Sequence, residues 1–266
     1  MIAIGNVVIT VINNLLGGII MKKLNLKNIL SLSFLVCMFC FFSPLQADTK
    51  VYSFSNTVDS TTTVKITASA TELEFSNNFL SLSKSISVDC YAQSKYANSE
   101  KDGYANFDKK TKTLSIVLNN FHECKISVPK SASINVDATN AKVDTKDNKY
   151  PININAKNTN LDLEHVRAPI QVNIDVGQLD IEDNTAAVKV KASSSKVKID
   201  DARANIDIAI SNTSDLKIDG DERVEYNYVF TNKPNLLQGA FPTSANPRAV
   251  TLKIDSDVSS SVRLDD

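Results

Sequence analysis

Acidic residues recur every 18 positions in the middle of this 266-residue chain. If one rung of a stacked β structure accounts for each step, equivalent side chains lie about 4.8 Å apart. Carboxylates at that distance repel by roughly 0.9 kcal/mol in water, and a bound cation would relieve the repulsion. The candidate cation or ligand face consists of six such residues: Asp144, Asp162, Glu164, Asp180, Glu182 and Asp183.

Other interpretations of this acidic series are a solvated polar face and a catalytic pair. Lys198 and Lys217 continue the series that starts at Asp144, so it partly neutralises itself. Asp162 and Asp180 on adjacent rungs would suit the acid and base of a polysaccharide-cleaving enzyme, but no Arg or aromatic platform accompanies them. The G-G-x-G-x-D repeats of calcium-binding β-rolls are missing. We therefore predict a protein that is not an enzyme and has no cofactor and no metal.

Cysteine usage indicates an oxidising compartment. Cys37 and Cys40 lie in an apolar N-terminal segment, which leaves Cys90 and Cys124 in the rest of the chain. An even pair in an exported protein predicts a disulfide. The alternative is a metal site that adds His122, for which no fourth ligand stands at a usual spacing.

Residues 21–47 have the character of an export signal, and residues 1–20 precede it. In residues 21–47, positive charge at Met21-Lys22-Lys23 precedes an apolar run and the sequence SPLQA, which ends at Ala47. The alternative is an uncleaved anchor, although the run is shorter than the roughly 20 residues of a spanning helix. Residues 1–20 carry no charge, so we expect translation to start at Met21; the alternative is an inserted hydrophobic extension.

A nine-residue spacing runs through the centre of the chain and would position the acidic residues. Apolar–polar–apolar units begin at nine successive positions and are typical of short strands with one buried face. The fifth residue of the unit is apolar in alternate units and polar in the units between them. The full repeat is therefore two units, or 18 residues, long and contains two strands. The nine positions are Ile134, Val143, Ile152, Leu161, Ile170, Leu179, Val188, Val197 and Ile206.

Two architectures fit this pattern. In an antiparallel meander all apolar side chains would face one side of a sheet, and short hairpins would favour Asn-Gly or Asp-Gly turns, which this stretch lacks. The prediction is an all-β, single-stranded parallel β-solenoid or β-helix with about 18 residues and two short strands per coil. Irregular β structure would cap it at both ends: residues 48–130 before the repeats at 131–220, and residues 221–266 after them.

The stretch ISVPKSASINVDATNAKVDTK, Ile126 to Lys146, resembles a bacterial family. It is similar to the putative-adhesin domains of unknown function, β-helix-like modules of the autotransporter-adhesin head type. The resemblance rests on the strand TLSIVL, then I-x-V-P-K, then repeated I-x-V units, and it covers roughly 50–260. This chain lacks the frequent Gly before each strand, as at Pro151 and Pro169. The resemblance implies a secreted or envelope-exposed β-solenoid and brings no catalytic residues.

We therefore predict an exported protein of the periplasm, cell surface or extracellular space that acts as an adhesin-like binding module. The partner would be an envelope component, a glycan or a protein. The alternatives are a structural spacer of the envelope and, third, a carbohydrate-active enzyme that uses the clustered Asp residues. A formal charge of −1 argues against nucleic acid, which needs a basic patch. We expect the protein to contact the membrane only through its signal segment, during export.

Overall fold

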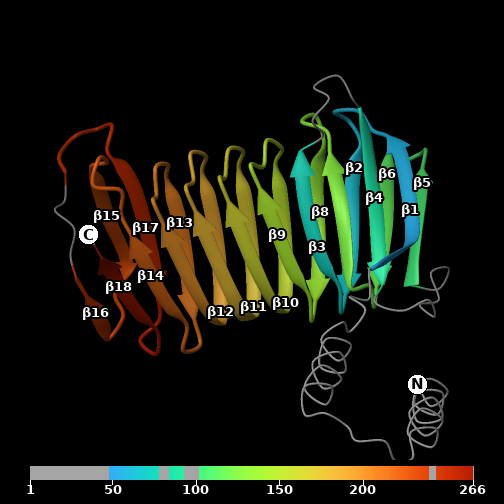
Figure 1. The fold of residues 1–266 in the computed structure, drawn as a ribbon. Coiled ribbons are helices and arrows are strands. Elements are labelled where there is room, and N and C mark those ends of the chain that lie inside the picture. Colours follow the sequence, from blue (N-terminus) through green and yellow to red (C-terminus); the bar gives the residue numbers. More distant parts are fainter. Residues whose placement is uncertain (1–47, 78–83, 93–101, 240–243, 266) are drawn as a thin grey trace, which may run out of the picture. The chain divides into compact units, whose positions relative to one another are not determined.

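The repeats form rungs that stack side by side in one large sheet, seen from green β8 to orange β13 in Figure 1. The computed structural model describes residues 48–77, 84–92, 102–239 and 244–265. The predicted signal segment and upstream extension lie outside the described residues. The described part is all-β, as predicted from the sequence, and the strands of its central rungs are β8 (Ser133–Thr139), β9 (Lys142–Lys146), β10 (Ile152–Glu164), β11 (Ile170–Glu182), β12 (Val188–Asp200), β13 (Ile206–Ser211) and β14 (Asp215–Asp219).

Neighbouring central rungs pair in parallel, and equivalent positions of the sequence repeat lie opposite each other. Ile152 of β10 pairs with Ile170 of β11, and Ile170 pairs with Val188 of β12. The first arm of each rung holds the positions equivalent to 152–157, and the second arm those equivalent to 160–164. In β10, β11 and β12 the two arms are one continuous 13-residue strand, whereas the sequence predicted two separate short strands.

The chain turns between arms at single residues with positive φ. One series lies between the two arms, at Asn140, Asn158, Val176, Ser194 and Asn212, with φ between 50° and 59°. A second series follows the second arm, at Asp147, His165, Asp183 and Asp201. Asn and Asp tolerate the left-handed conformation better than other non-glycine residues. Asn and Asp occupy six of these nine positions, so most of the turns need no glycine, and Val176, Ser194 and His165 occupy the other three.

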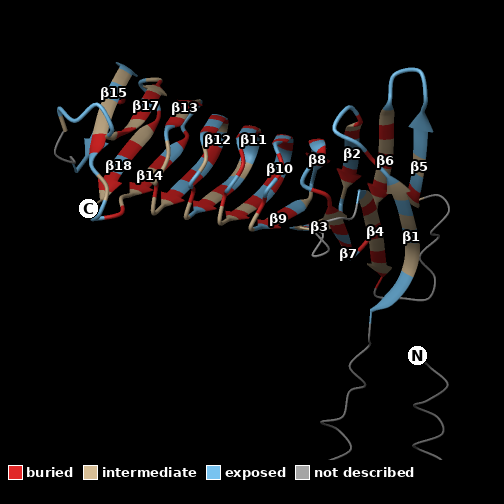
Figure 2. Ribbon diagram, turned by 90° about the horizontal axis from the view of Figure 1, so that it is seen from above, coloured by how far each residue is buried: buried red, intermediate tan, exposed pale blue. Residues whose placement is uncertain are grey.

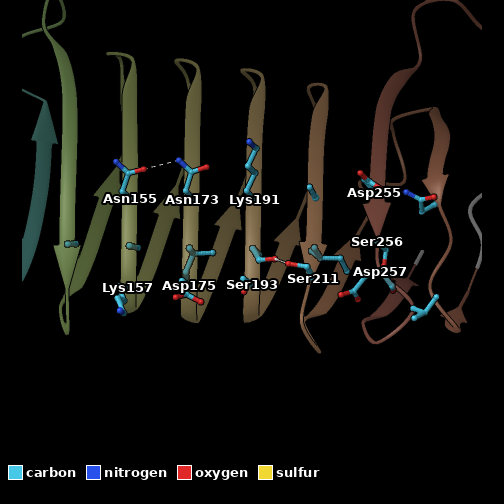
Figure 3. A pocket seen from close by; sticks show the side chains of 18 of the residues that line it. Asn155, Lys157, Asn173, Asp175, Lys191, Ser193, Ser211, Asp255, Ser256 and Asp257 are labelled. Atoms are coloured by element: carbon cyan, nitrogen blue, oxygen red, sulfur yellow. Dashed lines mark hydrogen bonds between the residues drawn. The ribbon is translucent and has the colours of Figure 1, made fainter.

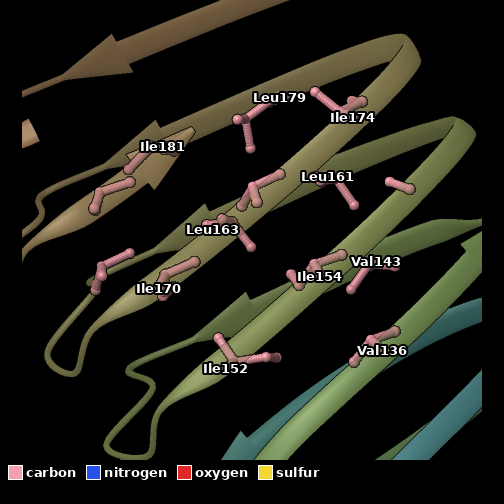
Figure 4. Close-up of a cluster of buried hydrophobic side chains, with 14 of the residues drawn as sticks. Val136, Val143, Ile152, Ile154, Leu161, Leu163, Ile170, Ile174, Leu179 and Ile181 are labelled. Carbon is pink, nitrogen blue, oxygen red and sulfur yellow. The ribbon is translucent and has the colours of Figure 1, made fainter. Parts of the chain in front are cut away.

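The core lies between the two arms. Ile152 and Ile154 of the first arm are buried, as are Leu161 and Leu163 of the second arm of the same strand. Figure 4 shows these side chains pointing toward one another and stacking on those of the next rung. Buried and exposed residues alternate along the strands, which produces the banding in Figure 2. Alternation with period two thus places every second side chain of both arms in one core.

The rungs at both ends are more regular than the irregular caps predicted from the sequence, and they are out of sequence order. At the N-terminal end, the rung of β2 and β3 lies between that of β6 and β7 and that of β8 and β9. At the other end, the rung of β17 and β18 lies between that of β13 and β14 and that of β15 and β16. These strands are β2 (Thr63–Ser69), β3 (Glu72–Asn77), β6 (Thr113–Asn119), β7 (Glu123–Val128), β15 (Tyr226–Asn232), β16 (Leu236–Gln238), β17 (Val250–Ser256) and β18 (Ser261–Asp265).

Antiparallel strands join the stack at its N-terminal end, within residues 48–130, where the sequence predicted an irregular β cap. Strand β5 (Gly103–Asp108) pairs with β6, while β4 (Ser85–Ala92) pairs with β7 and with β1 (Thr49–Thr57). Cys90 of β4 lies directly opposite Cys124 of β7 and forms a disulfide with it. Both cysteines are fully buried. The bridge therefore fastens the antiparallel strands to the parallel rungs.

Candidate functional site

The parallel register brings the predicted acidic residues together on the second arm. Asp162 of β10 pairs with Asp144 of β9 on one side and with Asp180 of β11 on the other. Glu164 and Glu182 form the adjacent column in the same way. Lys198 and Lys217 continue the Asp144 column on the next two rungs. The acidic column expected from the sequence therefore exists.

The two outer carboxylates of the column, those of Asp144 and Asp180, each interact with a neighbouring polar side chain. Lys142 Nζ lies 2.6 Å from Asp144 Oδ2, and Gln178 Nε2 donates a hydrogen bond of 2.7 Å to Asp180 Oδ2. Asp162, between them, forms no ion pair within the described part of the chain. Burial raises the pKa of Asp162, and three nearby carboxylates raise it further. Burial also raises the pKa of Asp144, against the lowering effect of Lys142.

Asp162→Asn is expected to stabilise the fold at neutral pH. Because the pKa of Asp162 is raised in the folded state, its contribution is most favourable below the unfolded value of about 3.9 and is lost as pH rises through the folded value. Removal of the charge should therefore raise the free energy of unfolding by about 1 kcal/mol at pH 7. At pH 3 the variant and the parent should be equal. Denaturant unfolding at both pH values measures this.

Asp175→Asn is the matched control for that variant. Asp175 lies on the first arm of β11, in register with Lys157, so its removal deletes an attraction and should give no stabilisation. Equal stability changes for the two variants at pH 7 would show that the acidic column does not repel itself.

Asp183, the sixth predicted residue, belongs to a turn rather than to the acidic columns. It has a φ of 57° and follows β11. Arg203 Nη1 lies 2.6 Å from Asp183 Oδ1, and His165 Nε2 lies 3.4 Å from its Oδ2. Its regular spacing from His165 and Asp201 thus reflects a conformational requirement of the turn. In the described ranges, no group of three or more His, Cys, Asp or Glu side chains is arranged to hold a metal ion.

A groove on the first arm was missed by the sequence reasoning. It has a volume of about 1060 Å³, whereas two other hollows on the described surface measure about 450 and 460 Å³. Its lining residues come from seven strands, β8, β10, β11, β12, β13, β15 and β17, and from the residues that directly follow β15 and β17. The groove therefore crosses the rungs, and Figure 3 shows its two rows of side chains.

A carboxylate and two amide side chains form a ladder along this groove, called the amide ladder below. Asn155 Nδ2 donates to Asp137 Oδ1 at 2.8 Å. Asn173 Nδ2 donates to Asn155 Oδ1 at 2.8 Å, and Figure 3 shows this second bond. All three side chains are in register on β8, β10 and β11. Each bond uses one of the two N–H groups of an amide, so a second N–H remains on each Asn for another acceptor. The ladder offers equally spaced polar groups to a molecule in the groove.

From β8 to β12 the charge that lines the groove alternates in sign from rung to rung, when both rows are taken together. Lys157 is in register with Asp175, which is in register with Ser193. On the ladder row, Lys191 follows Asn173. The lining includes three Lys and four Asp in all, a net charge of −1: Asp137, Lys157, Asp175, Lys191, Lys233, Asp255 and Asp257. The Asn155–Asn173 step has the same 18-residue spacing as the acidic residues, so a repeat among the uncharged residues also indicates this row.

Comparison with known proteins gives little further information. No protein-family model matches the chain, and no curated protein matches it. Among solved structures, the crystal structure of a putative cell adhesion protein from Clostridium sporogenes is similar, with a TM-score of 0.37 and 10% identity. The match covers 80% of this chain and 98% of that one. Similarity at this level is too low to transfer fold or function. Within the described residues, no helix has the length and hydrophobicity needed to cross a membrane.

Proposed function

We propose that this chain is an exported β-solenoid protein of the cell envelope that acts as a non-catalytic, adhesin-like binding module. The observation that carries the proposal is the groove across seven strands, with its ladder of Asp137, Asn155 and Asn173. Ligand sites are typically concave and present a few placed polar groups. A ladder that repeats from rung to rung suits recognition of an extended partner rather than turnover of a small substrate.

Export is supported by the disulfide between Cys90 and Cys124 and by the signal-like residues 21–47. Structural disulfides persist in secreted and periplasmic proteins and are rare in the reducing cytosol. The regular parallel register of the central rungs supports the solenoid architecture, in which each rung buries its apolar face on its neighbours. A binding surface built on such a stack is rigid, because each central rung is hydrogen-bonded to a neighbour on both sides.

The alternative function, a structural unit of the envelope, is favoured by the terminal rung of β15 and β16. In the described part of the chain each of these strands pairs on one side only. Val229, Leu236 and Leu237 of this rung are 41%, 51% and 40% exposed. Unpaired edges with apolar side chains are able to pair with another copy. Concentration-dependent growth into filaments would favour this alternative over adhesion.

The test is to express the full chain with its own leader, fractionate the cells and determine the mature N-terminus. We expect cleavage after Ala47 and recovery of the protein outside the cytoplasm. The purified mature protein should then sediment with isolated cell envelopes or with host-cell surfaces. A cytoplasmic protein with an intact leader, or a mature protein that binds no surface, would contradict the proposal.

A further inference from the structure

We propose that the first-arm groove binds a linear, uncharged glycan that runs across the rungs, with one sugar unit over each rung. This inference rests on the proposed binding function and names the chemical class of its ligand. Three features of the groove support it: the spare hydrogen-bonding groups of the amide ladder, the alternation of charge, and the distance between rungs.

Each Asn of the ladder keeps both a donor and an acceptor for a ligand. Asn155 donates one N–H to Asp137 and accepts a bond from Asn173, so one N–H and one lone pair of its amide remain for a ligand. A sugar hydroxyl is both donor and acceptor and pairs with both groups at once. Ser193 and Ser211 continue the second row with hydroxyls, as Figure 3 shows. Groups of this kind match the hydroxyls of a sugar better than they match an apolar ligand.

The alternation of charge disfavours charged polymers. Along the groove the charge changes sign from Asp137 to Lys157 and then to Asp175 and Lys191. A regular polyanion would be attracted by the lysines but repelled by the carboxylates on the rungs between them. A polycation would be attracted by the carboxylates and repelled by the lysines. Like charges at one rung of separation repel, so the attractions and repulsions of a uniform polymer cancel. An uncharged polymer avoids these repulsions and keeps the hydrogen bonds.

The distance between rungs determines which repeat length a ligand in the groove can match. Rungs of a parallel sheet are about 4.8 Å apart, whereas an extended peptide advances about 3.4 Å per residue. Peptide groups would therefore lose register with the ladder after about two rungs. A pyranose ring with its glycosidic oxygen spans close to one rung, so each unit of a linear glycan lies over one rung, and in a β-1,4-linked chain the two hydroxyl-bearing edges of the rings face the ladder in turn. Peptides bind sheets more readily as an added strand at an edge.

The test is binding of the purified, exported full chain to immobilised oligosaccharides of defined length. The probes are β-1,4-linked glucose and N-acetylglucosamine oligomers as uncharged ligands, with galacturonate oligomers as polyanions and glucosamine oligomers as polycations. We expect the uncharged ligands to bind at least tenfold more tightly than the charged ones. The affinity for them should rise with length up to about seven units, one for each strand that lines the groove, and then level off. The length series needs no variant and is independent of folding defects.

The double variant Asn155→Ala with Asn173→Ala should weaken binding of the uncharged oligomers at least tenfold. The matched control is Asn160→Ala, an exposed residue on the second arm of β10, which should bind as the parent does. Thermal unfolding establishes that both variants fold. Tighter binding of a charged series, an affinity independent of length, no binding of the uncharged oligomers, or parent-like binding by the double variant would overturn the inference. If the protein still binds cell envelopes in that case, the proposed function stands and only the ligand class is wrong.

Discussion

Replacement of Gly177 by alanine should lower the free energy of unfolding by about 3 kcal/mol or more. A Cβ at Gly177 would lie 2.0 Å from the carbonyl oxygen of Thr159 and 3.1 Å from its carbonyl carbon. Thr159 is the register partner of Gly177 on the neighbouring rung. The colliding atoms are backbone atoms in the sheet, so relief requires the two rungs to separate, and hydrogen bonds between them would be lost.

Ser195→Ala is the control for Gly177→Ala. Ser195 is the register partner of Gly177 on the next rung and already carries a Cβ at the equivalent position. The control loses only the bond of 2.7 Å from Ser195 Oγ to the Ser193 carbonyl oxygen and should cost about 1 kcal/mol. Denaturant unfolding compares the midpoints of the two variants with the parent. A Gly177→Ala midpoint equal to that of the parent would show that the rungs adjust without loss.

The acidic column could be predicted from the sequence because strict repetition determines register. Once equivalent positions of the repeat pair, Asp144, Asp162 and Asp180 must lie on successive rungs. The spacing alone does not give the structural reason for which a residue type recurs. Asp183 recurs with His165 because each occupies a turn position with positive φ. Acidic recurrence therefore marked two adjacent columns and one turn, and none of the three forms a metal cluster within the described residues.

The order of the end rungs could not be read from the sequence. Val64 and Ile66 of β2 pair with Ile134 and Val136 of β8, a far larger separation along the chain than that between central rungs. Each of these strands shows the same apolar alternation, so any of them could stack on any other by hydrophobic pattern alone. Which rung is outermost depends on the connecting segments and on packing between strands distant in sequence. The ladder of Asp137, Asn155 and Asn173 was not predicted for a different reason: two of its three residues are uncharged, and the repeat of acidic residues does not include them.

Removal of the disulfide by Cys90→Ala with Cys124→Ala should lower the free energy of unfolding by about 4 kcal/mol. The bridge closes a loop with a sequence separation of 34, and its loss increases the conformational entropy of the unfolded chain. It also joins β4, which pairs with β1, to the first parallel rungs through β7. Hydrogen exchange should therefore rise first in β1 and β4, while β10, β11 and β12 stay protected.

The same cysteines provide their own control, because reductant should destabilise the parent to the level of the double variant and leave the variant unchanged. Denaturant midpoints with and without dithiothreitol measure both effects. Both cysteines are fully buried, so reduction of the folded parent should be slow and should accelerate near its unfolding transition. A parent that loses less than about 1 kcal/mol on full reduction would show that cross-strand packing of β4 on β7, rather than the covalent bond, holds the antiparallel end of the stack.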